Sequence, residues 1–277
     1  MLWRAILLEK DKVYGRLILW IELAILVALI VLIDVLEFVV GQNLPGSAGA
    51  LLVDGLTWPR ALTTATQFAG SHTIGGILLV IVIGVITSRE YSWRTFHLWL
   101  SRGVSRTLLL EAKCIVIFLL SLTIVVISLI ISVILTGIFT LIVHNNLQID
   151  QVQWGTIIQN FLITDYGLLP YAALTFVLTI LSRSSIVSIS VVLVLILLVE
   201  PVAYNVFMAW GGIGMQIVQY LPLGLEYALN SAVNSSTPSV FLRNVPAPWL
   251  AVLGIALYTL IFTGIAIWRF LYQEFTD

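Results

Sequence analysis

Charged residues are scarce in this sequence, and their scarcity decides the class of protein. Only 10% of the 277 residues are Asp, Glu, Lys or Arg, whereas 60% are hydrophobic, and the mean hydropathy is +1.08. A water-soluble globule of this size needs a charged and polar surface that this composition does not provide. The sequence therefore predicts an integral membrane protein.

Motifs for metal, nucleotide and nucleophile chemistry are also missing. The one cysteine, Cys114, rules out an intrachain disulfide and is interpreted as a small buried apolar residue. Because the sequence contains no Gly-Lys dipeptide, it has no phosphate-binding loop of the form GxxxxGK[ST], and it has neither HExxH nor GxSxG. His72, His97 and His144 are scattered and are interpreted as non-ligands, so no metal site is predicted.

Six apolar runs are long enough to cross a bilayer, whose hydrocarbon core of about 30 Å takes about 20 residues as a helix. The fourth is the weakest because it is short, contains Pro170 and is separated from the fifth only by Ser182-Arg183-Ser184-Ser185. Without a turn at these four residues, the predicted number of spans would be five. The predicted spans are 17–40, 70–86, 114–135, 166–181, 186–210 and 249–268 of a single transmembrane domain, 1–277.

The basic residues predict the orientation, because short loops rich in Lys and Arg stay in the cytoplasm. With six spans and both termini in the cytoplasm, only Arg60 and Arg243 of the 13 basic residues fall outside. Merging the fourth and fifth spans would place Arg183 in hydrocarbon. The residues expected on the cytoplasmic side are Arg4, Lys10, Lys12, Arg16, Arg89, Arg94, Arg102, Arg106, Lys113, Arg183 and Arg269.

Two segments outside the spans are too apolar for ordinary loops. Apolar residues recur at three- and four-residue spacing in 1–16, which predicts an interfacial helix with Lys12 facing water, and no cleavable signal peptide is apparent there. The outer segment 211–248 is predicted to form either short helices on or dipping into the outer leaflet or an ordinary packed loop.

The cytoplasmic segment 87–113 combines aromatic and charged residues. Wound as a helix, it places Glu90, Arg94 and His97 on one face, toward the cytosol, and aromatic rings on another. Ser105 is expected to cap the third span. A generic basic loop is the alternative.

Several short motifs in this segment and beyond it resemble the permeases of the type 2 ABC transporter family. The motifs are Arg89-Glu90-Tyr91, Thr95, Arg102-Gly103-Val104-Ser105-Arg106, Lys113, Leu181-Ser182-Arg183-Ser184-Ser185, Glu200-Pro201 and Tyr220-Leu221-Pro222. In that family, the stretch corresponding to 87–113 is a coupling helix that docks into a separate ATPase subunit. The resemblance implies an all-α integral membrane fold with six transmembrane helices, an N-terminal interfacial helix and this coupling helix between spans two and three.

The resemblance also implies the partners and the location. They are two ATPase subunits, which carry ATP and Mg, a second permease chain, identical or homologous, and membrane lipid, with no nucleic acid and no cofactor on this chain. The location is the cytoplasmic membrane of a bacterium, and the function is export. The Leu- and Ile-rich spans favour an amphipathic or hydrophobic substrate over a large polysaccharide. The ATPase-docking residues it implies are Arg89, Glu90, Tyr91, Arg94, Thr95, His97, Arg102 and Arg106. Among these, Glu90 and Arg94 are the hypothesised polar contact with the ATPase.

Four ionisable residues lie inside the predicted spans, where each is costly in lipid. Glu22 is interpreted as structural. Asp34 and Glu37 share a face near the outer end of span one, either at a wet rim or on a substrate pathway. Glu200 is the deepest, roughly 21 Å along its helix, and is followed by Pro201, which leaves a carbonyl unpaired. It either packs structurally or contacts substrate.

Two other classes compete with the exporter. An ion-coupled carrier or a channel needs no ATPase and predicts inverted repeats or several charges at mid-membrane, of which Glu200 alone qualifies. An enzyme embedded in the membrane needs a nucleophile or metal constellation, and the sequence shows no motif for one. The chain is therefore not predicted to be an enzyme by itself.

Overall fold

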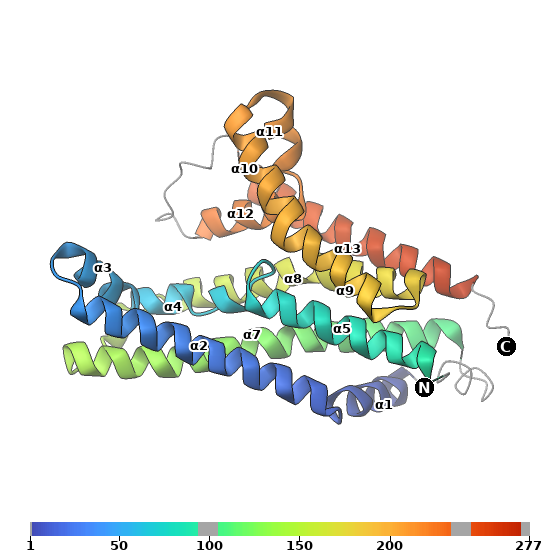
Figure 1. Ribbon diagram of the computed structural model, residues 1–277, viewed down its shortest axis with the longest axis horizontal. Coiled ribbons are helices and arrows are strands. Elements are labelled where there is room, and N and C mark those ends of the chain that lie inside the picture. Colours follow the sequence, from blue (N-terminus) through green and yellow to red (C-terminus); the bar gives the residue numbers. More distant parts are fainter. Residues whose placement is uncertain (1, 94–104, 234–244, 273–277) are drawn as a thin grey trace.

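The computed structural model describes residues 2–93, 105–233 and 245–272. Long helices lie roughly parallel in it, and the described residues contain no β-strand (Figure 1). Six helical stretches are long and apolar enough to cross a membrane, which confirms the predicted all-helical class and the number of spans. These stretches are α2 (Leu17–Asn43), the stretch Arg60–Ser92 that ends in α5 (Ile74–Ser92), α7 (Arg106–His144), α8 (Trp154–Ser182), Ser185–Trp210 and α13 (Pro248–Leu271).

Two of these helices are longer than their apolar runs. Helix α7 has 39 residues and begins directly after Ser105, whose Oγ accepts a hydrogen bond from the Leu108 amide, so the predicted cap is confirmed. Helix α8 begins at Trp154, twelve residues before the predicted start of the fourth span, because its first turns contain polar residues that a hydropathy count rejects. Asn160 and Asp165 are buried there against neighbouring elements.

The fifth span is one continuous but irregular helix. Helix α9 (Ser185–Val194) passes through a π-helical turn, Leu195–Val199, into α10 (Glu200–Trp210). Pro201 has no amide hydrogen to donate to the preceding turn, and a widened turn is a common accommodation of a lost i to i−4 hydrogen bond.

Shorter helices complete the chain. The N-terminal segment forms α1 (Leu2–Tyr14), as predicted. The outer segment contains short helices, one of the two predicted alternatives. The remaining short elements are α3 (Ser47–Gly55), α4 (Arg60–Thr64), η1 (Gln67–Ala69), η2 (Ile149–Gln151), α11 (Gly212–Val218) and α12 (Pro222–Val233).

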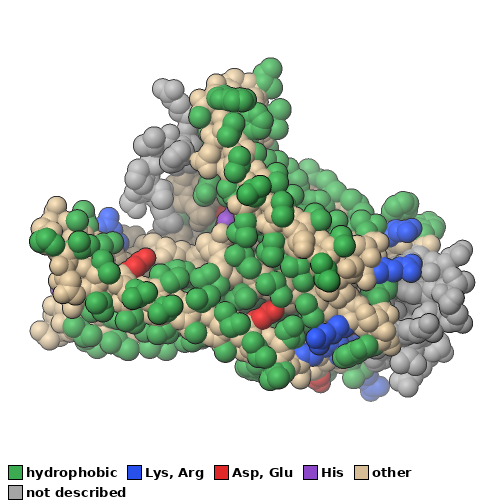
Figure 2. Space-filling view, viewed as in Figure 1, with side chains coloured by type: hydrophobic (Ala, Val, Ile, Leu, Met, Phe, Trp, Pro, Cys, Tyr) green, Lys and Arg blue, Asp and Glu red, His purple; other side chains and the backbone are tan. Residues whose placement is uncertain are grey.

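The two ends of the bundle differ. Helix α1, the end of α5, the start of α7 and the end of α13 lie at one end, here called the terminal end, and α3 and α4 lie at the other, the distal end (Figure 1). Hydrophobic side chains cover much of the visible surface between them, and most of the visible Lys and Arg side chains gather toward the terminal end (Figure 2).

The core is formed around α5 and α8. In the most apolar stretches of the second and fourth spans 61% of the residues are buried, compared with 17% in that of α13. Buried Leu79, Ile83, Leu168 and Phe176 pack together in the main hydrophobic cluster. Because α5 and α8 are central, the polar groups that they carry lie inside the bundle.

Candidate functional site

Four charged side chains meet at the terminal end. Lys12 Nζ lies 2.7 Å from Glu9 Oε1 and 2.6 Å from Glu90 Oε1. Lys113 Nζ lies 3.1 Å from Glu9 Oε2 and also pairs with Glu90. This group of Glu9, Lys12, Glu90 and Lys113, the terminal cluster, contains two carboxylates and two ammonium groups, so its charge is balanced.

The terminal cluster joins three helices. Glu9 and Lys12 come from α1, Glu90 from the end of α5 and Lys113 from the second turn of α7. The side chains of Glu90 and Lys113 are only 3% and 7% exposed. Burial alone would raise the pKa of Glu9, but the charges of Lys113 and Lys12 outweigh it and hold that pKa below its usual value. The cluster therefore fastens α1 to the two helices that flank residues 94–104.

The structure separates the described members of the predicted docking set. Glu90 points into the bundle and not toward the cytosol, and Lys12, expected to face water, pairs with it, because α1 folds back against α5 and α7. Arg89 is exposed, with its guanidinium carbon 6.0 Å from the centroid of the Trp93 ring. The docking residues that lie outside the described residues are Arg94, Thr95, His97 and Arg102.

The other two described docking residues contact neighbouring elements of the same chain. Tyr91 is half-buried, and the Arg183 guanidinium carbon lies 6.0 Å from its ring centroid. Arg106 Nη1 donates to the carbonyl oxygens of Phe270 (3.4 Å) and Leu271 (2.9 Å), the last carbonyls of α13. The terminal end is thus held together by polar contacts that link α1, α5, α7, α13 and the turn after α8.

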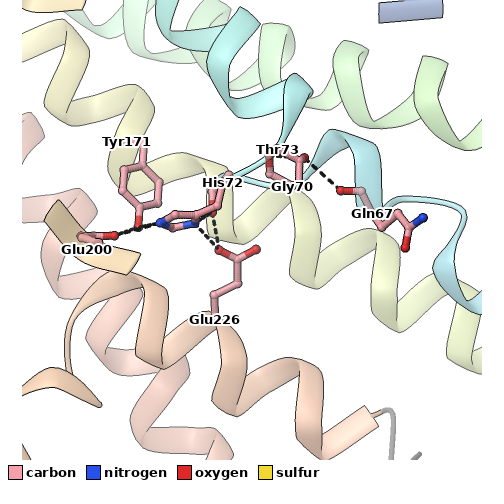
Figure 3. A network of polar contacts seen from close by, with 8 residues as sticks. Gln67, Gly70, His72, Thr73, Tyr171, Glu200 and Glu226 are labelled. Atoms are coloured by element: carbon pink, nitrogen blue, oxygen red, sulfur yellow. Dashed lines mark hydrogen bonds and ion pairs between the residues drawn. The ribbon is translucent and has the colours of Figure 1, made fainter. Parts of the chain in front are cut away.

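A second polar cluster lies between the spans (Figure 3). His72 Nε2 is 3.1 Å from Glu200 Oε2, and His72 Nδ1 is 3.8 Å from Glu226 Oε2. Tyr171 donates its hydroxyl hydrogen to Glu200, and Ser71 donates to Glu226. We call these five residues the distal cluster.

The imidazole of His72 is the centre of the distal cluster. It lies between two carboxylates and edge-on to the Tyr171 ring, with the ring centroids 5.2 Å apart and the planes at 89°. The side chains of His72, Glu200 and Glu226 are 15%, 6% and 12% exposed. Two carboxylates therefore share one imidazole in a nearly closed environment.

A tight turn before α5 brings Ser71 and His72 into this position. The Gly76 amide donates to the Gly70 carbonyl over 3.0 Å, and Thr73 Oγ1 donates to the carbonyls of Gln67 and Gly70, 2.9 Å in each case (Figure 3). A Cβ atom on Gly76 would lie 2.0 Å from the Ser71 carbonyl oxygen. Only glycine fits there.

A cavity of about 420 Å³ opens beside the distal cluster. Its wall includes His72 and Glu226 but not Glu200, and consists otherwise mostly of hydroxyl, amide and aromatic side chains. The lining residues are Thr63, Thr64, Thr66, Gln67, Gly70, Ser71, His72, Thr73, Asn160, Thr164, Leu223, Glu226, Tyr227 and Asn230. The arrangement is suited to binding a polar or charged ligand.

The ionisable residues expected inside the spans have different environments. Asp34 is buried and Glu37 is exposed, so the two carboxylates have different environments. Glu22 is also buried, and its Oε2 has no hydrogen-bond partner within residues 2–93, 105–233 and 245–272. Asp165 is a further buried carboxylate, missed because the fourth span was expected to begin after it.

Sequence reasoning singled out Glu200 and missed its partners. His72 was interpreted as a non-ligand at the outer boundary, and Tyr171 and Glu226 carried no sequence signal, since they lie on other helices. In the described part of the chain, no three His, Cys, Asp or Glu side chains are grouped so as to hold a metal ion.

A family model described as "Protein of unknown function (DUF2705)" matches residues 25–274. No curated protein and no solved structure matches the chain. The match covers the first span from residue 25, the other five spans in full, the distal cluster and two members of the terminal cluster.

Proposed function

The chain belongs to the DUF2705 family, whose description states no function, and from this premise we propose that it is the permease subunit of an ATP-driven exporter. The terminal end is the cytoplasmic one. A separate ATPase, in two copies, docks there and supplies the energy, and a second permease chain completes the pathway. The membrane is the bacterial cytoplasmic membrane, and the substrate is amphipathic or hydrophobic.

The observation that carries this proposal is the terminal cluster. The motifs that resemble type 2 ABC permeases concentrate in 87–113, and the cluster joins both flanks of that segment to α1 through buried ion pairs. A loop that only connected two spans would not require three buried charges and a partly buried fourth at its base, because desolvating each buried charge costs several kcal/mol. A segment that transmits force from a docked subunit to the spans does require rigid connections between the helices that flank it.

The mechanism follows from this connection. A displacement of the docked segment 93–105 moves the end of α5 and the start of α7 together, and α1 moves with them. Because packed helices shift as rigid bodies, the movement reaches the distal half of the same helices. Helix α5 begins at Ile74, two residues after His72, so its displacement alters the distal cluster. ATP hydrolysis at one end thereby changes the cavity at the other.

A second candidate function is an ion-coupled carrier, and the distal cluster favours it. The sequence offered only Glu200 as a deep charge, whereas His72 and Glu226 now stand beside it. Buried carboxylates and histidines that exchange protons are the usual machinery of such carriers. This candidate predicts transport by the chain alone on an ion gradient.

Purification from the native host separates the two candidates. An affinity-tagged chain, extracted in mild detergent, is expected to copurify with a subunit that contains GxxxxGK[ST], and the complex is expected to hydrolyse ATP. A chain that purifies alone and moves substrate into liposomes on a proton gradient would contradict the exporter and support the carrier.

A matched pair of variants tests the docking end. Arg89→Glu reverses an exposed charge at the terminal end, and Arg60→Glu makes the same change at the exposed Arg60 of the distal end. We expect Arg89→Glu to reduce ATPase copurification several-fold and Arg60→Glu to leave it unchanged. Equal retention in both variants would place the ATPase contact elsewhere.

A further inference from the structure

We propose that the cavity beside the distal cluster binds an organic cation through its ammonium group, with Glu226 as the charged contact. The transport of that cation rests on the proposed function, but its binding does not. The source of the ammonium group, a small amine or the lysine side chain of a peptide, is a second question. The chemistry that the site recognises is the same for both.

The first argument is charge. With both carboxylates ionised, Glu200 and Glu226 contribute −2, and His72 contributes at most +1, so the distal cluster has a net charge of −1 or −2. None of the cavity-lining residues within the described ranges is Lys or Arg. An uncompensated negative charge in the wall of a cavity attracts a cation and repels an anion.

The second argument is an acceptor oxygen that the cluster leaves available. Glu200 is engaged by Tyr171 and His72 and does not line the cavity. Glu226 lines the cavity, and its Oε2 accepts from Ser71. Its Oε1 has no hydrogen bond within the described part of the chain, and Figure 3 shows this oxygen pointing away from the imidazole. A ligand donor fits that oxygen.

The third argument is the size and the wall of the cavity. Cavities that bind small organic ligands measure about 300–1,000 Å³, and this one, at about 420 Å³, is far larger than a single ion requires. The described residues offer no metal-binding group. The amide of Asn230 and the 45% exposed ring of Tyr227 line it, and an aromatic face attracts an ammonium group. An organic cation therefore fits better than a metal ion.

Protection of an introduced cysteine tests the binding. Replacing Cys114 by Ser leaves a chain without cysteine, and Asn230→Cys then places one thiol in the cavity wall. The rate of its reaction with uncharged N-ethylmaleimide is measured on purified protein in nanodiscs. Three probes of similar size are compared: benzylammonium, benzyl alcohol and phenylacetate.

In the Asn230→Cys protein, we expect saturating benzylammonium to slow labelling of the introduced thiol at least about threefold. Benzyl alcohol and phenylacetate are expected to leave the labelling rate unchanged. Glu226→Gln is expected to abolish the protection. Glu37→Gln, which removes an exposed carboxylate of α2, is expected to retain it. If Glu226→Gln does not fold, the comparison of the three probes on the Asn230→Cys protein still decides the matter.

Three results would overturn the proposal. Equal protection by benzyl alcohol would show that charge is not recognised. No protection by any probe would show that the cavity binds none of them, and an unreactive thiol would show that it is closed to solvent. Each result concerns the purified chain alone, so it leaves the ATPase test untouched, and failure of that test leaves the binding result intact.

Discussion

The two polar clusters use similar residues for opposite purposes. The terminal cluster pairs two carboxylates with two ammonium groups, and the cavity beside it measures about 20 Å³, which holds about one water molecule. The distal cluster sets two carboxylates against one imidazole beside a cavity of about 420 Å³. The terminal cluster, with balanced charges and almost no cavity, fastens helices together. The distal cluster, with excess negative charge beside a large cavity, is suited to binding a ligand.

The largest effect is expected from breaking the terminal cluster. Lys113→Met removes the ammonium group that pairs with both Glu9 and Glu90, and removing one partner of a buried pair costs about 3–5 kcal/mol. The apparent free energy of unfolding in mixed micelles measures the loss. Lys10→Met on α1 is the control, and we expect it to change that energy by less than about 0.5 kcal/mol. A similar small change in Lys113→Met would mean that the cluster does not fasten the helices.

The distal cluster is expected to tolerate substitution better, and unequally. Glu200→Gln weakens the contacts with Tyr171 and His72, each an interaction with a charged acceptor, at a cost of about 1.5–3 kcal/mol. Glu226→Gln is expected to cost less, about 1 kcal/mol, because only one of its oxygens accepts a hydrogen bond among the described residues. The same unfolding measurement ranks the two variants. A larger stability cost for Glu226→Gln than for Glu200→Gln would mean that Glu226, and not Glu200, is the structural carboxylate of the cluster.

A double-mutant cycle sharpens the contrast further. Glu90→Gln together with Lys113→Met removes both charges of one buried pair, so the combined cost is expected to fall short of the sum of the single costs by about 1–2 kcal/mol. Glu200→Gln and Lys113→Met change residues of two separate clusters, so the stability costs of these two substitutions are expected to add. Additivity in the first pair would show that Glu90 and Lys113 do not interact.

The smallest effect is expected from acidification. The pKa of Glu9 lies below its ordinary value of 4.5 in the folded chain, so the stability that its ionised form contributes is present above that value and is lost as pH falls through the folded pKa. Unfolding measured between about pH 6 and about pH 3.5 is expected to show a larger loss in the unaltered chain than in Glu9→Gln. Parallel curves would mean that Glu9 is not stabilised by its lysines.

The number of spans could be predicted from the sequence because each span is a long apolar run, and Arg183 marks the turn between the fourth and fifth. The start of α8 could not, because Asn160 and Asp165 count as polar until the fold buries them. The burial of Asn160 depends on α4, where the carbonyl of Thr63, 97 positions away in the sequence, accepts a hydrogen bond from the Asn160 side-chain amide.

The two clusters were only partly visible in the sequence for the same reason. Glu200 is conspicuous as a charge in an apolar run, but Ser71 and Glu226 are 155 positions apart and meet only in the folded chain. Glu90 was identified in the sequence, but its side chain was predicted to face the cytosol, which was wrong. Helical periodicity in 87–113 does not reveal that Lys12 of α1 pairs with Glu90 of α5. Local pattern identifies the charge, and tertiary packing decides its partner.

Photocrosslinking in the native host tests the central claim, that a separate ATPase acts on the terminal end. A benzophenone amino acid replaces Trp93, which is 61% exposed at the end of α5, or Trp154, which is 57% exposed at the distal start of α8. After irradiation, position 93 is expected to capture a protein that contains GxxxxGK[ST], and position 154 is not. Failure of position 93 to capture such a protein, with the chain fully expressed, would contradict the claim.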